Sequence, residues 1–415
     1  MKTSRIIRRL FIYSCGLLLP LSILAQGGYL SLSGKIIDKT TQKPVPYAYI
    51  GMMSKGTGTL TNEDGQFFYR FPRIANDSLV VVAVMGYQPF HQKASSYTFN
   101  QKEVVIELLP TQPRLVDSAY IKTFEARNLI AEALAKIKKN NPQTPYLLNG
   151  FYAESLQQNG EYAEIREALL QTEKDPRPKI LVPQKVKAIR GRTFVSENRS
   201  KVMEGYAFPN GATIVTHTID VAVPEYLDGK NLYDYVYELD DTITYYLEKQ
   251  VYRILFRPVN AGIKAARNGV ISISAADTAI VQIEYDFTQE GVKDVLKTST
   301  SDKLFGKTKR EPKRLYTCIN YKPFAGKWYL QDYRMWLDTQ FEQKSSQLLG
   351  SIKLQFVTTD IQKSNGNRIP ETDVLIDTES FSQQKVPKYD EIMWGNFNYI
   401  IPTEAMRQIV THLVK

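Results

Sequence analysis

Alternation of apolar and polar residues between residues 145 and 400 is the feature that most constrains the fold of this chain. Around residue 284, for example, Val281, Ile283 and Tyr285 alternate with polar residues. Successive side chains of a strand point to opposite faces, and one apolar face with one wet face is typical of an antiparallel sheet. The pattern predicts one antiparallel sheet with strands at residues 251–257, 270–274, 280–287, 314–321, 327–337 and 350–361.

A helix is predicted for residues 125–140, EARNLIAEALAKIKKN. Its apolar residues recur at the spacing of one buried helical stripe, and they are Ala126, Leu129, Ile130, Ala133, Leu134 and Ile137. Lysines near its C-terminal end interact favourably with the negative end of the helix dipole, and Pro142 ends the helix. We expect this helix to pack on the apolar face of the sheet. The run YAEIREALL, residues 162–170, fits either a helix or a strand.

One helix cannot cover the whole face of such a sheet. Sixteen helical residues span about 24 Å, whereas six strands span about 29 Å. The uncovered part would be an apolar groove suited to an acyl chain or a hydrophobic segment. Its predicted lining is Tyr252, Ile254, Phe256, Ile283, Tyr285 and Phe287. The alternative is that residues 150–250 complete the core and leave no groove.

Residues 30–110 predict a compact all-β unit. Short runs rich in Val, Ile, Tyr and Phe are separated by Gly, Pro, Asn and Asp, as in a β-sandwich. The acidic cluster at residues 62–65 could be a calcium loop or a turn. Its oxygen-bearing residues are consecutive rather than alternating, which does not fit an EF-hand. A turn fits better, because Asp64 can bond to its own backbone and Gly65 tolerates positive φ.

The same stretch resembles a known family. The motifs are Gly34-x-Ile36-x-Asp38, Pro44-x-Pro46-Tyr47-Ala48, Thr61-Asn62-Glu63-Asp64-Gly65-x-Phe67 and Met85-Gly86-Tyr87. In this order they are similar to the carboxypeptidase regulatory-like domain. The resemblance implies a seven-stranded, transthyretin-like Greek-key sandwich of about 80 residues, found in many envelope proteins of Gram-negative bacteria. It implies a fold and a compartment but no reaction, because this domain has no active site of its own.

The rest of the chain has a second resemblance. PYLLNGFY, REALL, VYRILFRP, GKWYL and WGNFNYIIP, which lie between residues 145 and 402, resemble the region that follows this domain in uncharacterised envelope proteins. The strand pattern also resembles that of periplasmic lipoprotein carriers. That resemblance implies a curved sheet that forms an open half-barrel.

The N-terminus predicts export. A basic start is followed by the apolar run Leu10 to Leu24, which is short for a membrane span and ends before Gln26. We expect a signal peptide at residues 1–25, with no acylation of Cys15. Its removal would lower the net charge from +10 to +6, without a basic block, so a nucleic-acid partner is not expected. Cys318 would then be the single cysteine, expected to be a buried small residue.

Motifs for chemistry are sparse. His91, His217 and His412 stand outside zinc motifs, and no G-x-S-x-G elbow occurs. We therefore expect no catalytic, cofactor or metal residues. The tyrosine-rich segment at residues 231–256 could stack on sugars, although tyrosine is also a common strand residue.

The expected protein is mainly β with some α. Its domains are a signal peptide (1–25), a regulatory-like sandwich (26–110), a linker with the helix (111–142) and an antiparallel β-rich domain (143–415). We expect a non-enzymatic protein of the periplasm or the inner side of the outer membrane. The sandwich would serve in docking or folding, and the larger domain would bind a lipid, an apolar segment or an envelope protein. The alternatives are a carbohydrate-binding accessory protein and a hydrolase of unidentified type.

Overall fold

The computed structural model describes most of the chain beyond its N-terminus. The described residues are 28–73, 78–98, 100–112, 114–115, 126–175, 185–204, 206, 211, 231–297, 309–343, 346–363, 368–375 and 391–412. The predicted signal peptide and His217 lie outside them. None of the helices in these ranges is long and apolar enough to cross a membrane.

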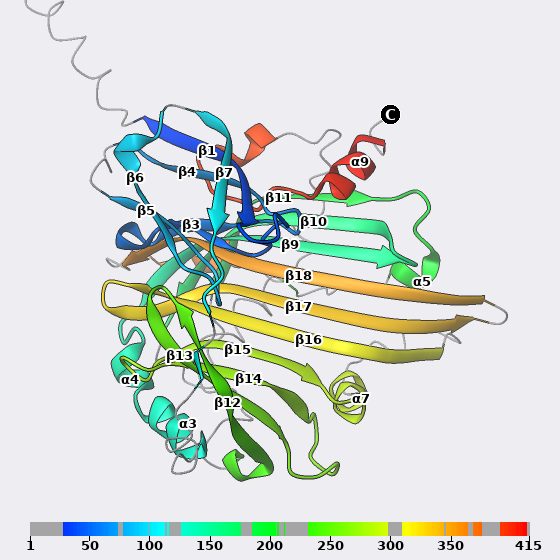
Figure 1. Ribbon diagram of the computed structural model, residues 1–415. Coiled ribbons are helices and arrows are strands. Elements are labelled where there is room, and N and C mark those ends of the chain that lie inside the picture. The colour runs from blue at the N-terminus through cyan, green and yellow to red at the C-terminus, as the bar shows by residue number, and fades with distance from the viewer. Residues whose placement is uncertain are drawn as a thin grey trace, which may run out of the picture.

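Seven strands form an N-terminal sandwich of two sheets, ordered β4-β1-β7 and β3-β2-β5-β6 (Figure 1). They are β1 (Tyr29–Asp38), β2 (Tyr49–Met52), β3 (Thr57–Leu60), β4 (Gln66–Pro72), β5 (Leu79–Ala83), β6 (Phe90–Lys93) and β7 (Gln101–Leu108). Two short 3-10 turns accompany them, η1 (Met53–Lys55) and η2 (Ala94–Ser96). The sandwich has a core of its own, with Leu32, Phe67 and Val82 fully buried between the sheets. The predicted seven-stranded sandwich is confirmed.

The remaining strands form one antiparallel sheet ordered β11-β10-β9-β18-β17-β16-β15-β14-β13-β12-β8. They are β8 (Arg114–Leu115), β9 (Tyr146–Gln158), β10 (Glu161–Lys174), β11 (Lys185–Val195), β12 (Tyr235–Tyr246), β13 (Lys249–Pro258), β14 (Arg267–Ser274), β15 (Ile280–Phe287), β16 (Lys309–Phe324), β17 (Lys327–Gln343) and β18 (Ser346–Lys363). The six predicted strands are all present, and the larger antiparallel sheet is confirmed. The ambiguous run at residues 162–170 lies in β10 and is therefore a strand.

The helices among the described residues are short. They are α3 (Ala126–Ala135), α4 (Ile137–Asn140), α5 (Lys201–Glu204), α7 (Gln289–Lys297) and α9 (Glu404–His412), with 3-10 turns η4 (Leu232–Asp234), η6 (Glu371–Asp373) and η7 (Glu391–Trp394). The single helix predicted at residues 125–140 is instead two, because Lys136 leaves the helical conformation at φ −88° and ψ 0°. There the Lys136 Nζ donates to Thr278 Oγ1 at 3.0 Å and the Asn140 side chain donates to the Asp277 carbonyl at 3.1 Å.

The large sheet is buried on both faces at strands β10, β9 and β18, near one of its edges. We call the face that carries Tyr152, Leu170 and Phe356 the inner face, and the face that carries Phe151 and Val357 the outer face. Neighbouring residues of β9 thus belong to two different cores, which explains why this strand does not show simple alternation of burial. Ala126, Ile130 and Ala133 of α3 join the inner core, so the helix packs on the sheet as predicted.

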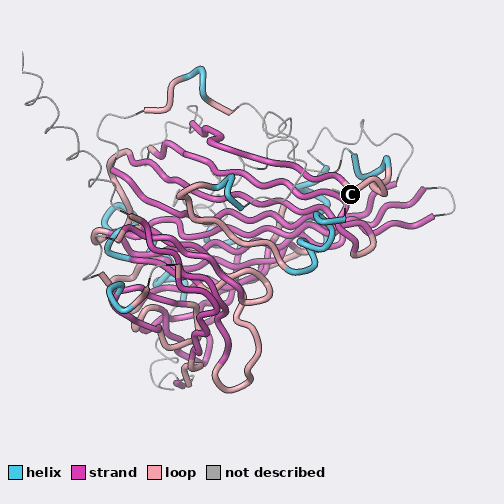
Figure 2. The backbone as a smooth tube through the Cα atoms, turned by 90° about the horizontal axis from the view of Figure 1, so that it is seen from above, coloured by secondary structure: helices cyan, strands magenta, loops and turns pink. Residues whose placement is uncertain are grey.

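The sandwich lies across one end of this sheet rather than beside it (Figures 1 and 2). Val81 and Ala83 of β5 belong to the inner core of the sheet. Tyr49 and Leu60, from β2 and β3, belong to the outer core. The sandwich therefore packs against the large sheet through both of its apolar cores.

Candidate functional site

The predicted groove residues lie mainly in the inner core. Ile254, Phe256 and Ile283 are buried there, and Tyr285 and Phe287 are partly buried against it. The guanidinium of Arg267 lies 4.5 Å from the ring centre of Phe287 and 5.5 Å from that of Tyr285. Tyr252 is half-buried and is not a member of that core. The structure thus packs five of the six residues in or against one core, among the protein's own side chains.

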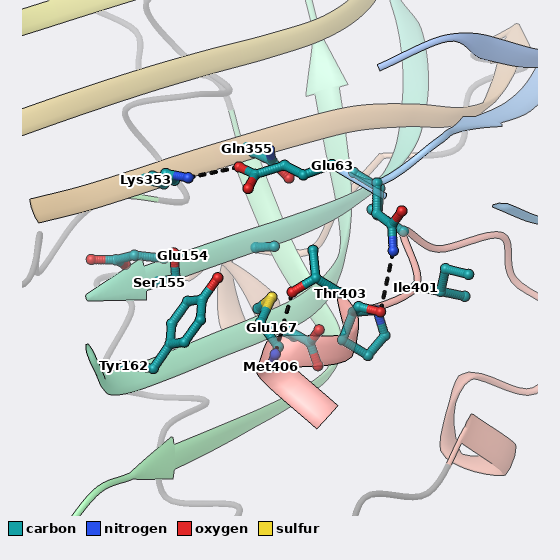
Figure 3. A pocket seen from close by; sticks show the side chains of 14 residues that line it. Glu63, Glu154, Ser155, Tyr162, Glu167, Lys353, Gln355, Ile401, Thr403 and Met406 are labelled. Carbon is teal, nitrogen blue, oxygen red and sulfur yellow. Dashed lines mark hydrogen bonds and ion pairs between the residues drawn. The ribbon is translucent and has the colours of Figure 1, made fainter. Parts of the chain in front are cut away.

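A small hollow lies instead on the outer face, where the sandwich, the sheet and the C-terminal segment meet (Figure 3). We call it the junction pocket and define it by Glu63, Ser155, Tyr162, Lys353, Thr403 and Met406. Its volume of about 40 Å³ has room for a few water molecules. Its walls combine hydroxyl, amide and charged groups with the apolar side chains of Ile400 and Ile401.

The turn at residues 62–65 positions the sandwich side of the pocket. Asn62 Oδ1 accepts hydrogen bonds from the backbone N–H groups of Asp64 and Gln66, at 3.0 and 2.9 Å. Gly65 has φ +70°, as the turn requires. The predicted turn is confirmed, but its side-chain bond comes from Asn62 and not from Asp64. Asp64 Oδ2 instead accepts from the backbone N–H of Glu404 at 3.0 Å, at the start of α9.

Glu63, the central residue of this turn, faces the sheet. Its Oε1 accepts from Lys353 Nζ at 2.7 Å, the ion pair drawn in Figure 3, and from the Tyr47 hydroxyl at 3.0 Å. Burial and the carboxylate of Glu63 raise the pKa of Tyr47, so its hydroxyl remains a donor. This ion pair joins the sandwich to β18 across the edge of the pocket.

The C-terminal segment closes the other side of the pocket. The side-chain amide of Asn398 bonds to both backbone groups of Arg70 in β4, at 2.7 and 3.0 Å. Thr59 Oγ1 donates to the Tyr399 carbonyl at 2.9 Å, and Asn62 Nδ2 donates to the Pro402 carbonyl at 3.2 Å. The segment therefore runs along the sandwich and covers the edge of its strand β4, before α9 begins.

The floor of the pocket carries a buried ion pair. Glu167 on β10 and Arg192 on β11 are cross-strand partners, with 2.6 Å between Arg192 Nε and Glu167 Oε2. Arg192 is fully buried, and its guanidinium lies 4.7 Å from the ring centre of Trp394. Glu167 at the floor of the pocket is thus paired with Arg192, as Glu63 at the rim is paired with Lys353.

Tyr162 supplies a hydroxyl from β10. Its pKa is raised, mainly by burial, while hydrogen bonding to Thr403 opposes that rise. The pocket thus offers uncharged groups that can exchange hydrogen bonds with a polar ligand. They are the Tyr162 phenol, the Ser155 and Thr403 hydroxyls and the Gln355 amide. Among the described residues, no group of three or more His, Cys, Asp or Glu side chains is arranged to hold a metal ion.

The sandwich can be placed among known domains. Residues 32–117 match the CarboxypepD_reg-like domain family. The match spans the sandwich and the short β8, and it agrees with the resemblance carried by the sequence motifs. The other ten strands of the large sheet lie outside the match.

Two further comparisons concern the whole chain. No curated protein matches its sequence. The solved crystal structure of a DUF1329 family protein from Desulfovibrio piger ATCC 29098 aligns with 7% sequence identity and a TM-score of 0.26. The alignment covers 61% of this chain and 100% of that chain. A TM-score this low supports no conclusion about the fold or the function of the larger sheet.

The other residues singled out in the sequence have separate surroundings. Cys318 is buried, and burial raises the pKa of its thiol to about 11, as suits a small core residue. His91 Nε2 lies 3.3 Å from a carboxylate oxygen of Glu248. Within the tyrosine-rich segment, Tyr235 is buried whereas Tyr233 is 70% exposed, so these rings do not form one continuous surface.

Sequence patterns did not reveal the junction pocket. Glu63 belongs to the acidic cluster at residues 62–65, but its partner Lys353 is 290 residues away. Ser155, Tyr162 and Thr403 are ordinary strand and loop residues without a motif. The signal in the sequence was the acidic turn itself, which has more acidic residues than a simple hairpin turn needs.

Proposed function

We propose that this chain is a non-enzymatic protein of the cell envelope that binds a protein partner at the junction pocket. The CarboxypepD_reg-like domain acts as a folding module, and the large sheet supplies most of the binding surface. The observation that carries this proposal is the position of the hollow. It lies on the outer face between three segments of the chain, whereas Ile254, Phe256 and Ile283 of the predicted groove are buried in the inner core.

The chemistry of the pocket favours binding over catalysis. Glu63 is paired with Lys353, and Glu167 with Arg192. Each of these carboxylates therefore has its charge balanced by an adjacent cation. The uncharged groups that remain, such as the Tyr162 and Ser155 hydroxyls, are suited to hydrogen bonds with a polar side chain of a partner.

Localisation in the envelope rests on two observations. The N-terminal sequence has the pattern of a signal peptide, and domains of the matched family occur in many envelope proteins. We place the mature protein in the periplasm or on the periplasmic side of the outer membrane.

Site-specific photo-crosslinking in cells tests this proposal. A photoreactive side chain at Tyr162 and one at Met406 should both capture the same partner, identified by mass spectrometry. The control position is Leu349, which is 40% exposed on β18 away from the pocket. Ser155→Leu, which fills the pocket, should abolish capture at both positions. Equal capture from Leu349, or different partners from the two pocket positions, would contradict a binding site here.

A second candidate is binding of an acyl chain or apolar segment on the inner face. Helix α3 supports this candidate, because it contacts the inner face mainly through the small residues Ala126 and Ala133, together with Ile130. The ligand would have to displace this helix. A fluorescent fatty acid should then bind more tightly to Ile130→Ser than to the wild type. Absence of displaceable binding in both proteins would eliminate this candidate.

A further inference from the structure

A buried lysine lies between the CarboxypepD_reg-like domain and the large sheet. Lys322 on β16 is 0% exposed. Its Nζ lies 3.1 Å from the Gly56 carbonyl, 3.3 Å from the Thr358 carbonyl and 3.5 Å from the Tyr49 hydroxyl. Two of these three oxygens belong to the sandwich and one belongs to the sheet. The amine is therefore a direct link between the two parts of the molecule.

All three oxygens that contact this amine are uncharged. Within the described residues, Lys322 forms no ion pair. The carboxylates that act on it electrostatically are Asp360 of β18 and Asp332 of β17. Asp332 is held by Arg334 at 3.2 Å and by Asn320 at 2.9 Å.

The other groups around the amine add little charge. Asp360 accepts hydrogen bonds from Asn149 and Gln362. On the sandwich side, burial holds the pKa of Tyr49 well above its usual range, so that residue is neutral. The ring centre of Tyr49 lies 4.9 Å from Nζ. An ammonium ion here would be buried without a direct counter-ion, which is costly in a protein interior.

The turn of the sandwich above Lys322 is packed tightly on the sheet. Gly56 has φ +69°, and a Cβ at this position would lie 3.2 Å from side-chain atoms of Ile361 and Phe324. The Gly56 carbonyl can therefore reach the amine only while the sandwich is fully seated on the sheet. Lifting the sandwich from the sheet would break the contacts of Nζ with Gly56 and Tyr49, two of its three, and admit water to it.

We propose that Lys322 is a pH-sensitive latch, which holds the sandwich on the sheet while its amine is neutral and loosens this contact when the amine is protonated. The direction follows from linkage. Burial lowers the pKa of Lys322 to about 7, with Asp360 and Asp332 opposing the shift. The free value is about 10.4. The closed state thus binds fewer protons than the open state between these two values, so closure is favoured as pH rises through that range and the charge penalty is complete below about pH 7.

Hydrogen exchange of the full chain, followed by mass spectrometry of peptides covering residues 49–60, measures the opening of this contact. Exchange is compared at pH 6, 7, 8 and 9 after correction for the intrinsic chemical rate. The opening constant of the wild type should fall by up to about tenfold per pH unit above pH 7 and should be flat below it. Lys322→Met should remove the dependence. Lys249→Met, which removes a half-buried lysine of β13 outside both this contact and the junction pocket, should retain it.

Lys322→Arg keeps a permanent charge and should open at every pH. It provides a second readout if Lys322→Met does not fold. A wild-type opening constant that does not change between pH 6 and pH 9, or a pH dependence that survives in Lys322→Met, would overturn the latch. This test is independent of the junction pocket, because Lys322 does not line it.

Discussion

At the scale of single residues, Gly65 and Asp64 give the acidic turn two different roles. Gly65 allows the backbone to reverse, with φ +70°. Asp64 belongs to the same turn but bonds to a residue 340 positions away. Local chain reversal and long-range attachment are thus carried by adjacent residues, which is why the turn has more acidic character than a hairpin requires.

Gly65→Ala should lower the free energy of unfolding by roughly 2–4 kcal/mol, because it combines positive φ with a steric clash. A Cβ at this position would approach the Ile36 carbonyl oxygen to 2.6 Å. Gly326→Ala is the matched control, since Gly326 has φ +76° but no atom within 4 Å of its Cβ position. That variant should cost only about 1–2 kcal/mol. Equal losses in urea denaturation would show that the close approach at Gly65 has no effect.

Asp64→Ala should destabilise the protein by about 1 kcal/mol, because the backbone N–H of Glu404 loses its acceptor at the start of α9. Asp64→Asn keeps an acceptor oxygen and should lie within a few tenths of a kcal/mol of the wild type. Urea denaturation gives the total effect, and hydrogen exchange at residues 404–408 locates it. Unchanged exchange in Asp64→Ala would contradict a capping role.

At the scale of elements, strand β10 is covered on both faces, with Leu170 in the inner core and Leu169 in the outer core. Charged residues of this strand are therefore buried in pairs, as in Arg166 with Glu164. Glu167 and Arg192 are the clearest pair, since both are almost fully buried and they are joined across neighbouring strands. The pair lies under Trp394, so it also supports the C-terminal segment.

Arg192→Met should cost roughly 3–5 kcal/mol, because it leaves the Glu167 carboxylate buried without its cation. The double variant Glu167→Gln with Arg192→Met should cost less than the sum of the two single variants, since the uncompensated charge is absent. Urea denaturation of the four proteins forms the cycle. Additive losses would mean that the two side chains are not coupled.

At the scale of the whole molecule, the sandwich and the sheet depend on each other unequally. The sandwich has a separate core, in which Leu32 and Phe67 are fully buried. The outer core of the sheet, by contrast, includes Tyr49 and Leu60 from the sandwich and Trp394 from the C-terminal segment. The sheet is therefore incomplete without the sandwich, whereas the sandwich retains its own core without the sheet.

Expression of the two parts separately should show this difference. Residues 28–112 should give a cooperative thermal transition by circular dichroism. Residues 126–412 should aggregate or elute as large species in size-exclusion chromatography, because the part of the outer core that the sandwich covers would face water. A monomeric, cooperatively melting large domain would contradict the role of the sandwich as a folding module.

Export is the second prediction at this scale. The mature protein should begin at Gln26, because a basic start and a short apolar run precede it. N-terminal sequencing of the protein from its native envelope checks this boundary. Detection of Met1, or of an acylated Cys15, would refute it.

Much of the architecture could be predicted from local patterns. The alternation around Ile283 and Phe356 located strands of the large sheet, and the stripe of Ala126, Ile130 and Ala133 located a helix and its buried side. The break at Lys136 could not be predicted, because it depends on contacts with the distant Thr278. Strand β10 was ambiguous for a related reason: burial of both faces removes the alternation that identifies a strand.

The turn at Gly65 and the period of the strands could be predicted from local sequence, because each depends on residues a few positions apart. Which faces are covered and which polar groups meet depends on tertiary packing. In the sequence, Lys322 is an ordinary strand residue. In the structure, the Gly56 carbonyl of the sandwich lies 3.1 Å from its amine. Glu63 reads as a turn residue until Lys353 is placed opposite it. Such contacts form between segments hundreds of residues apart, and no local propensity encodes them.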